Sequence, residues 1–587
     1  MGHGHHHHHG HSHGHSHGHD HDHEHGHTHG HGEDAGPLPA AFDTAVPDSE
    51  LTPDQLSRRS MLRRAGLLGA GVAGASVLVG TGSAAAAQRG GNGNGNGRSN
   101  GNGSNRLLWL AGDHHIHTQY SPDGQYRVVD QVGNAARFGL DWMVITDHGS
   151  VTHSRIGVER VNPDIKRARE QYEDTLVFQG LEWNIPAAEH GTVFVHPGDN
   201  EVSVLKQFET DYDGSVKNAT GSTSANEALA ISGLDFLAEQ VQRRKVKDAL
   251  MLANHPSRKG VDSPHEIRGW RDAQPDIAVG FEGAPGHQAG GIPAPHGPGE
   301  ARGSYGGSPG ADSFAGYPAE SYRTWGGFDW MTATVGGLWD SLLSEGKPWW
   351  ITANSDSHVV YADTSTRPDG SDYDENGQHG DPVYRGSGLN LTASDFWPGQ
   401  YSRTHVGAYG FSYAAVMQGI REGRVWVDHG GLISGLKAEL RGGNKSATLG
   451  GTLNVRRGTQ VELRIEIALA GGPNAALFVP ELARVDVIRG LVTGRPSDLD
   501  TFRAPDTKVV KSFDVDETEG TVTFTYRLGR VERAGYVRLR GTDGNRSQTG
   551  LYGASVDPAG PALDVLGDAD PWLDLWFYSN PIWVLPE

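Results

Sequence analysis

Short clusters of His, Asp and Glu recur along the middle of the chain, each directly after an apolar run. They are D-H-H-I-H-T at 113–118, I-T-D-H-G at 145–149, Q-G-L-E-W at 179–183, A-N-H-P-S-R at 253–258 and A-N-S-D-S-H at 353–358. Alternate residues of a strand point to the same side, so His115 and His117 would share a face, as would Asp356 and His358. The chain has no Cys. The pattern therefore predicts one site for divalent metal ions with nitrogen and oxygen ligands.

The apolar runs alternate with helix-like segments. Strand-like runs at 142–146, 176–180, 249–253 and 349–353 follow helix-like segments at 128–139, 163–173, 225–247 and 328–345. A helix near 411–423 and a strand at 424–429 complete the series. This alternation predicts an α/β fold with parallel strands, whose polar ends meet at one rim. The loops 285–322 and 362–402 are long and rich in Gly, Pro, Ser and Asp, which is typical of lids or insertions.

The series of motifs resembles the PHP family (polymerase and histidinol phosphatase) over roughly 107–430. That family begins with D-x-H-x-H-T-x-x-S-x-D-G, which here runs from Asp113 to Gly124. Its later motifs are an apolar-T-D-H, a Gly-x-Glu, a His-Pro and an S-D-x-H, all present in order. The resemblance implies a distorted (β/α)7 PHP-type barrel. It also implies two or three divalent metal ions (Zn, Mn or Fe) and a metal-bridging hydroxide as nucleophile.

The resemblance further implies nine ligands in three groups. These are His115, His117, Glu182 and Asp356 for the first ion; Asp123, His148 and His358 for the second; and Glu182, His190 and His255 for the third. Glu182 would bridge two ions, which lie roughly 3.5–4 Å apart in two-metal sites. For the third ion we prefer His190 to His196, because His190 leads into a strand.

Residues beside the ligands are candidates for roles in catalysis. Asp147 precedes a ligand, where it could act directly or only orient its neighbour. Arg258 and Lys259 follow the His-Pro motif and could hold a phosphoryl oxygen. Glu282 either lines the pocket or merely ends a strand. Arg323 and Arg403 are weaker candidates as cations. His405 and His429, near the rim, are expected to be structural, with a role as general acid as the alternative. Solvated positions are expected for His153, His265, His287, His296 and His379.

The chain is predicted to contain five segments. These are a disordered His-rich region at 1–56, a twin-arginine (Tat) signal peptide at 57–87, a Gly/Asn linker at 88–105, a metal-dependent hydrolase domain at 106–431 and an antiparallel β-sandwich-like domain at 432–587. The signal is indicated by S-R-R-S at 57–60, a weakly apolar run and S-A-A-A-A at 83–87. The last segment is indicated by period-2 alternation between turn residues.

These features predict an exported metal-dependent phosphoesterase acting on a small phosphomonoester or diester. The alternatives are a carbamate, ester or amide hydrolase on the same site, or a metal-storage protein with an inactive barrel. The formal net charge of −21 disfavours binding to nucleic acid or to an anionic membrane. The expected partners are the small-molecule ester and, during export, the Tat translocase. No stable membrane span is expected, and the mature protein would be secreted, cell-wall associated or periplasmic.

Overall fold

The computed structural model describes residues 107–386, 388–545 and 559–587. The predicted His-rich region, Tat signal and linker lie outside these residues. No helix of the described part is long and apolar enough to cross a membrane.

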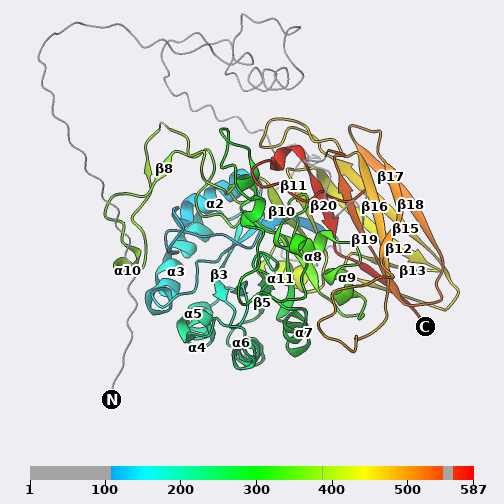
Figure 1. Ribbon diagram of the computed structural model, residues 1–587, viewed down its shortest axis with the longest axis horizontal. Coiled ribbons are helices and arrows are strands. Elements are labelled where there is room, and N and C mark those ends of the chain that lie inside the picture. Colours follow the sequence, from blue (N-terminus) through cyan, green and yellow to red (C-terminus); the bar gives the residue numbers. More distant parts are fainter. Residues whose placement is uncertain (1–106, 387, 546–558) are drawn as a thin grey trace, which may run out of the picture. The chain divides into compact units, whose positions relative to one another are not determined.

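A mixed sheet carries the motifs (Figure 1). Its first strands are β1 (Leu108–Asp113), β2 (Trp142–Ile145), β3 (Leu176–Asn184), β4 (His190–Val195), β5 (Ala249–Ala253), β6 (Ala278–Ala284) and β7 (Trp350–Ala353). The pairs β1–β2, β2–β3, β5–β6 and β6–β7 are parallel, as predicted. Strand β4 instead runs antiparallel to both β3 and β5. The connection 185–189 is too short for the crossover that a parallel neighbour requires, so the chain reverses.

Helices pack on the outside of this sheet. They are α2 (Val128–Arg137), α3 (His153–Gln171), α4 (Glu201–Tyr212), α5 (Gly214–Lys217), α6 (Ser224–Gln242), α7 (Pro264–Ala273) and α11 (Tyr413–Arg421). Figure 1 shows α3, α4, α6 and α7 along one side of β3 and β5. The helix predicted near 328–345 is two short helices, α8 (Trp330–Ala333) and α9 (Leu338–Leu343). Gly336 between them has φ +75°, a conformation that interrupts a right-handed helix.

The two long loops predicted from composition contain only short elements. Loop 285–322 holds the 3-10 turns η2 (Gln288–Gly291), η3 (Arg302–Ser304) and η4 (Ala319–Tyr322). Loop 362–402 holds β8 (Ser365–Thr366), α10 (Tyr373–Asn376) and β9 (Val383–Tyr384).

The described strands do not close into a barrel. Strand β10 (Ser402–Ala408) pairs with β1 and with β11 (Val425–His429), and no ladder joins it to β7. Side chains bridge this gap instead. The Thr404 hydroxyl accepts from Ala353 N (2.8 Å) and donates to Ala353 O (2.6 Å), and the Asn580 amide pairs with Ile351 N (2.9 Å) and O (3.5 Å). The expected closed barrel is therefore not confirmed, although side chains of Thr404 and Asn580 satisfy the backbone groups on the open edge of β7.

The C-terminal strands form two layers. One sheet is antiparallel and contains β13 (Lys445–Thr448), β12 (Ile433–Gly442), β15 (Gln460–Leu469) and β18 (Thr521–Arg530). The other strands are β14 (Thr452–Val455), β16 (Arg484–Leu491), β17 (Lys508–Asp514), β19 (Gly535–Thr542), β20 (Trp576–Ser579) and β21 (Ile582–Pro586), with the turn η5 (Pro571–Leu573) before β20. Apolar side chains of both layers share one buried cluster, as in a sandwich.

The second of these layers continues the sheet that carries the motifs, because β20 pairs with β11. A buried ion pair adds to this joint: Asp340 of α9 accepts two bonds from Arg538 of β19, at 2.9 and 2.7 Å. Trp350 of β7 also packs edge-on against Trp583 of β21, with ring centroids 5.4 Å apart. The C-terminal strands therefore form part of the support for β7.

Replacing Asn580 with Ala tests this support. The change leaves the buried N–H and C=O of Ile351 unpaired, so we expect a loss of about 1–3 kcal/mol in the free energy of unfolding. Denaturant unfolding of the purified protein would measure it. Asn444→Ala, in the exposed turn between β12 and β13, is the matched control. Equal stability of the two variants would contradict a bridging role for Asn580.

Candidate metal centre

The nine predicted ligands come together at one edge of the sheet. His115 and His117 follow β1, His148 follows β2, Glu182 lies in β3, His190 begins β4, His255 follows β5, Asp356 and His358 follow β7, and Asp123 lies on the loop after β1. Because β4 is antiparallel, its first residue lies at the same edge as the last residues of its neighbours. His196 lies beyond the opposite end of β4.

Two of these ligands have strained backbone. His255 has φ +30° and Asp356 has φ +47°, in the left-handed region that residues other than Gly rarely adopt. Such strain costs about 1–3 kcal/mol per residue and is concentrated at functional sites. Each strained residue lies in the turn that immediately follows its strand.

The first group is fully buried and tightly packed. His115 Nε2 lies 3.1 Å from Glu182 Oε1 and 3.0 Å from Asp356 Oδ1. His117 Nε2 lies 3.3 Å from Glu182 Oε2 and 3.2 Å from Asp356 Oδ1. The two Nε2 atoms are themselves only 3.0 Å apart. Two imidazole nitrogens and two carboxylates therefore converge on one point.

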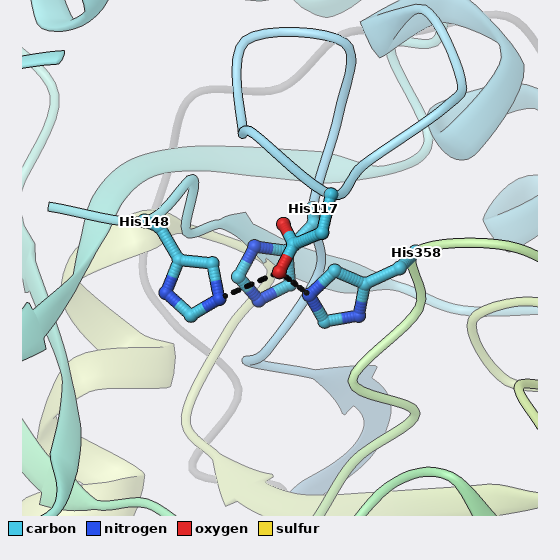
Figure 2. Close-up of side chains that lie close together, drawn as sticks. His117, His148 and His358 are labelled. Carbon is cyan, nitrogen blue, oxygen red and sulfur yellow. Dashed lines mark ion pairs between the residues drawn. The ribbon is translucent and has the colours of Figure 1, made fainter. Parts of the chain in front are cut away.

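The second group lies beside the first and is more open. Asp123 Oδ2 is 3.1 Å from His148 Nε2 and 3.5 Å from His358 Nε2. Figure 2 shows the rings of His117, His148 and His358 gathered around these ion pairs. The rings of His117 and His358 are stacked, with centroids 3.8 Å apart. The Asp123 side chain is 49% exposed, so this group faces the solvent side of the site.

The third group shares Glu182 with the first. His190 Nδ1 lies 2.9 Å and His255 Nε2 lies 3.3 Å from Glu182 Oε1. Glu189, which the sequence did not single out, lies with its Oε1 3.6 Å from His255 Nδ1 and forms a potential ligand group with both histidines. The carboxylate of Glu182 thus faces all three groups.

Neighbouring side chains fix which nitrogen of His115 and His117 faces the site. Glu282 Oε1 lies 2.7 Å from His115 Nδ1, and a carboxylate can only accept there, so Nδ1 carries the proton. The Ser121 hydroxyl donates to Asp123 (2.9 Å) and so accepts from His117 Nδ1 (3.1 Å). In the neutral rings, each Nε2 therefore carries a lone pair, and this lone pair points at carboxylate oxygens. Lone pairs facing carboxylates repel each other unless a cation lies among them.

Several buried polar atoms of the site also form no hydrogen bond within the described residues. They are Asp356 Oδ1, Glu182 Oε2, His255 Nδ1 and His358 Nε2. Buried polar atoms without partners are costly, and ion binding is one of the few arrangements that satisfies them. The donors present thus fit divalent cations.

Electrostatics within the cluster point the same way. Burial favours the neutral form of Glu182, but His148 and His115 outweigh it and hold its pKa well below the usual range. The same opposition, with His115 and His287, lowers the pKa of Asp356. Burial alone would lower the pKa of His115 and His148, yet the facing carboxylates raise both well above normal. In the metal-free cluster the histidines and carboxylates therefore favour each other's charged forms.

The three residues predicted to act beside the ligands lie in different places. Arg258 lines the cavity and donates to Glu189 Oε1 at 2.6 Å. Lys259 contacts the same oxygen at 3.0 Å, but its side chain is 58% exposed and does not line the cavity. Asp147 is buried and accepts from the backbone and the hydroxyl of Thr118, so it holds the loop after β1. Neither of the weaker candidates, Arg323 and Arg403, lines the cavity.

Three histidines predicted to be solvated are buried or mostly buried. His153 pairs with Glu209 at 2.9 Å, His379 packs on the loop after β1, and His287 contacts Asp356. The prediction was wrong because polar, Gly-rich local sequence suggests exposure, whereas these segments fold over the strand ends. His287 lies three residues after the end of β6. A polar residue shortly after a strand was the signal used for the other motifs, and it could have identified His287 as well.

Glu282, which was expected either to line the pocket or merely to end a strand, positions two of the ligands. Besides holding His115, its other oxygen accepts from His255 N at 2.6 Å. Of the two rim histidines, His405 pairs with Asp428 at 2.7 Å, and His429 is buried between the rings of Phe328 and Tyr401.

A cavity of about 400 Å³ opens over the three groups. Its walls come from seven of the nine predicted ligands, all but His115 and His117, together with Arg258, His287, Val359 and part of loop 362–402. The loop residues that line it are Thr392, Ala393, Ser394 and Asp395.

The family model for the PHP domain matches residues 113–255. This range includes seven of the nine predicted ligands and ends at His255, before Asp356 and His358. No curated protein sequence matches the chain. The PHP match and the clustered donors together support a metal-dependent hydrolase at the family level.

Solved structures give weaker likeness. A two-domain protein from Bacteroides vulgatus, which contains a predicted PHP-like metal-dependent phosphoesterase, is 15% identical over 74% of this chain and 90% of its own, with a TM-score of 0.29. A candidate metal-dependent phosphoesterase from Bifidobacterium adolescentis is 15% identical over 29% and 76%, with a TM-score of 0.17. Endonuclease Q, bound to a 27-mer duplex substrate with an abasic lesion, is 14% identical over 32% and 47%, with a TM-score of 0.18. Likeness at these TM-scores supports no shared activity.

Protons should compete with metal at this centre. The facing carboxylates raise the pKa of His115 and of His148 in the metal-free chain, so protons compete with ions for these rings and ion binding releases protons. As the pH rises through those pKa values the competition disappears. We therefore expect tighter Mn²⁺ binding at pH 8 than at pH 6, with protons released to the buffer, measured by titration calorimetry in two buffers. Affinity that falls between pH 6 and pH 8 would contradict this.

Proposed function

We propose that the chain is a metal-dependent phosphoesterase that cleaves a small phosphomonoester or diester. The observation that carries this proposal is the charge of the donor set. Three carboxylates, Asp123, Glu182 and Asp356, face a site whose other predicted ligands are imidazoles. Asp395 is a fourth carboxylate in the cavity wall, and the charge of Arg258 is offset by Glu189, so three dications would leave a net positive charge over the cavity. Such a site favours an anionic ester over a neutral carbonyl substrate.

The ions, which we propose to be Zn, Mn or Fe, would be held by the three ligand groups described above. When bound they supply positive charge at the phosphoryl oxygens and activate water. The chain's own residues then position the reactants. Arg258, fixed by Glu189, is placed to hold a phosphoryl oxygen at the cavity wall. Glu282 and Ser121 keep His115 and His117 in the orientation that faces the ions.

The size of the cavity supports a small substrate. Its roughly 400 Å³ lies within the range of small-molecule sites, and the lining residues of loop 362–402 are short. The net charge of −21 adds support for a small ester over nucleic acid.

We also propose that residues 57–87 form a Tat signal and that the mature chain is secreted, cell-wall associated or periplasmic. The support is the twin arginine at Arg58 and Arg59, the weakly apolar run after it and the small residues at 83–87.

The activity is tested with nitrophenyl phosphate and bis-nitrophenyl phosphate, using protein reconstituted with Mn²⁺ or Zn²⁺. We expect cleavage that chelator abolishes and Asp356→Ala removes. Within this assay, Arg258→Ala should lower kcat/KM about 10- to 100-fold, because a hydrogen bond to a charged group contributes about 1.5–3 kcal/mol.

Lys259→Ala is the matched control for that variant. The two cations are adjacent and share Glu189, but only Arg258 lines the cavity. Cleavage of nitrophenyl acetate and of neither phosphate ester would move the assignment to a carbonyl hydrolase. Equal activity of Arg258→Ala and the control would remove Arg258 from the substrate site.

Export is tested by expressing the full chain in a host with a Tat pathway. We expect the exported protein to begin near residue 88 by mass spectrometry, and replacement of Arg58 and Arg59 by Lys to block its appearance outside the cytoplasm. An exported product that still contains residue 60 would refute the predicted cleavage.

A further inference from the structure

His287 lies in the metal centre although none of the motifs includes it. Its Nε2 is 2.8 Å from Asp356 Oδ2, and its Nδ1 contacts Asp395. The side chain is 15% exposed and lines the cavity. Its backbone has φ +51°, so it shares the strained conformation of His255 and Asp356. Of the nine described residues other than Gly with positive φ, three belong to this cluster.

Asp395 fixes the orientation of the His287 ring. Its Oδ2 accepts from the backbone N–H of His358 (2.6 Å) and Val359 (2.9 Å), and its Oδ1 accepts from the Ser394 hydroxyl (3.2 Å). A carboxylate that serves as acceptor in all these bonds also accepts from His287 Nδ1. The proton of the neutral imidazole then resides on Nδ1, and the Nε2 lone pair points at Asp356.

The same arrangement occurs on the other side of Asp356. There His115 has its Nδ1 held by Glu282 and its Nε2 3.0 Å from Asp356 Oδ1. Asp356 therefore has His287 at Oδ2 and His115, together with His117, at Oδ1. His115 and His287 are each oriented from behind by a buried carboxylate. This is the way in which proteins hold imidazoles that bind metal.

We propose that His287 is a further metal-binding side chain, which shares Asp356 with the first group, and that Asp395 is its positioning residue. His287, Asp356 and His358 have ligand atoms within 4.8 Å of one another, close enough to contact one ion. The inference rests on the metal centre of the proposed function and is independent of phosphate specificity. It also ties loop 362–402, which contains Asp395, to the ions.

The test is metal binding, without any substrate. Zn²⁺ and Mn²⁺ would be titrated into metal-free wild type and into four variants: His287→Ala, His287→Gln, Asp395→Asn and, as control, His265→Ala. His265 is 39% exposed and pairs with Asp500 away from the cavity, so its loss should change nothing. We expect both His287 variants to bind at least one ion about 10-fold or more weakly. Asp395→Asn should weaken it by roughly 10- to 100-fold, as for other groups that orient ligands.

His287→Gln separates a ligand from a hydrogen-bond donor. The Gln amide can donate a hydrogen bond to Asp356 Oδ2 but is a poor ligand for these ions, so wild-type affinity in this variant would overturn the proposal. X-ray absorption of the Zn²⁺-loaded proteins gives a second readout, with fewer imidazole ligands per ion expected in His287→Gln. An unchanged count would likewise overturn it. Thermal unfolding of the metal-free variants checks that each is folded.

The outcome is separable from that of the proposed function. A wild-type chain that binds ions tightly and cleaves no phosphate ester would refute the phosphoesterase and leave the titration of His287 variants fully interpretable.

Discussion

The carboxylate of Glu182 is the interaction on which the site depends. Its two oxygens lie within 3.3 Å of a nitrogen from each of five histidines: His115, His117, His148, His190 and His255. One buried carboxylate cannot satisfy five imidazoles by hydrogen bonding, because it offers about four lone-pair directions. Cations among these groups would remove this mismatch, because each nitrogen and oxygen could then donate an electron pair to an ion. The strand ends are arranged around this one side chain.

The antiparallel strand β4 is what allows Glu182 to reach so many partners. A parallel strand after β3 would begin at the far edge of the sheet. Because the short connection reverses the chain, His190 pairs in register with Asn184, beside Glu182 on the same hairpin. The following strand β5 then brings His255 to the same edge. Asn254 completes the contact by donating to Glu182 Oε1 at 3.1 Å.

Much of the site could be predicted from the sequence because its signals are local. A His, Asp or Glu directly after an apolar run needs only the strand to be recognised, and β5 has the predicted bounds. The site residues that the sequence did not reveal are positioned by contacts with segments far away in the chain. His287 is positioned by Asp395, which lies in another loop, and Glu189 forms an ion pair with Arg258. The opening between β7 and β10 could not be predicted from local sequence either. Hydrophobic periodicity predicts strands, but not whether the first and last strands of a sheet pair with each other.

That opening places a demand on the rest of the molecule, because the loop with Asp356 and His358 follows β7 immediately. On one side, Thr404 and Asn580 pair the free backbone groups of Ala353 and Ile351, and Asn580 belongs to the turn between the last two strands. On the other, Asp395 accepts the backbone N–H of His358. Two strained positions, at Asp356 and His287, are held between these supports. The C-terminal strands, through Asn580, and loop 362–402, through Asp395, therefore both support the segment that carries Asp356 and His358, next to the opening in the sheet.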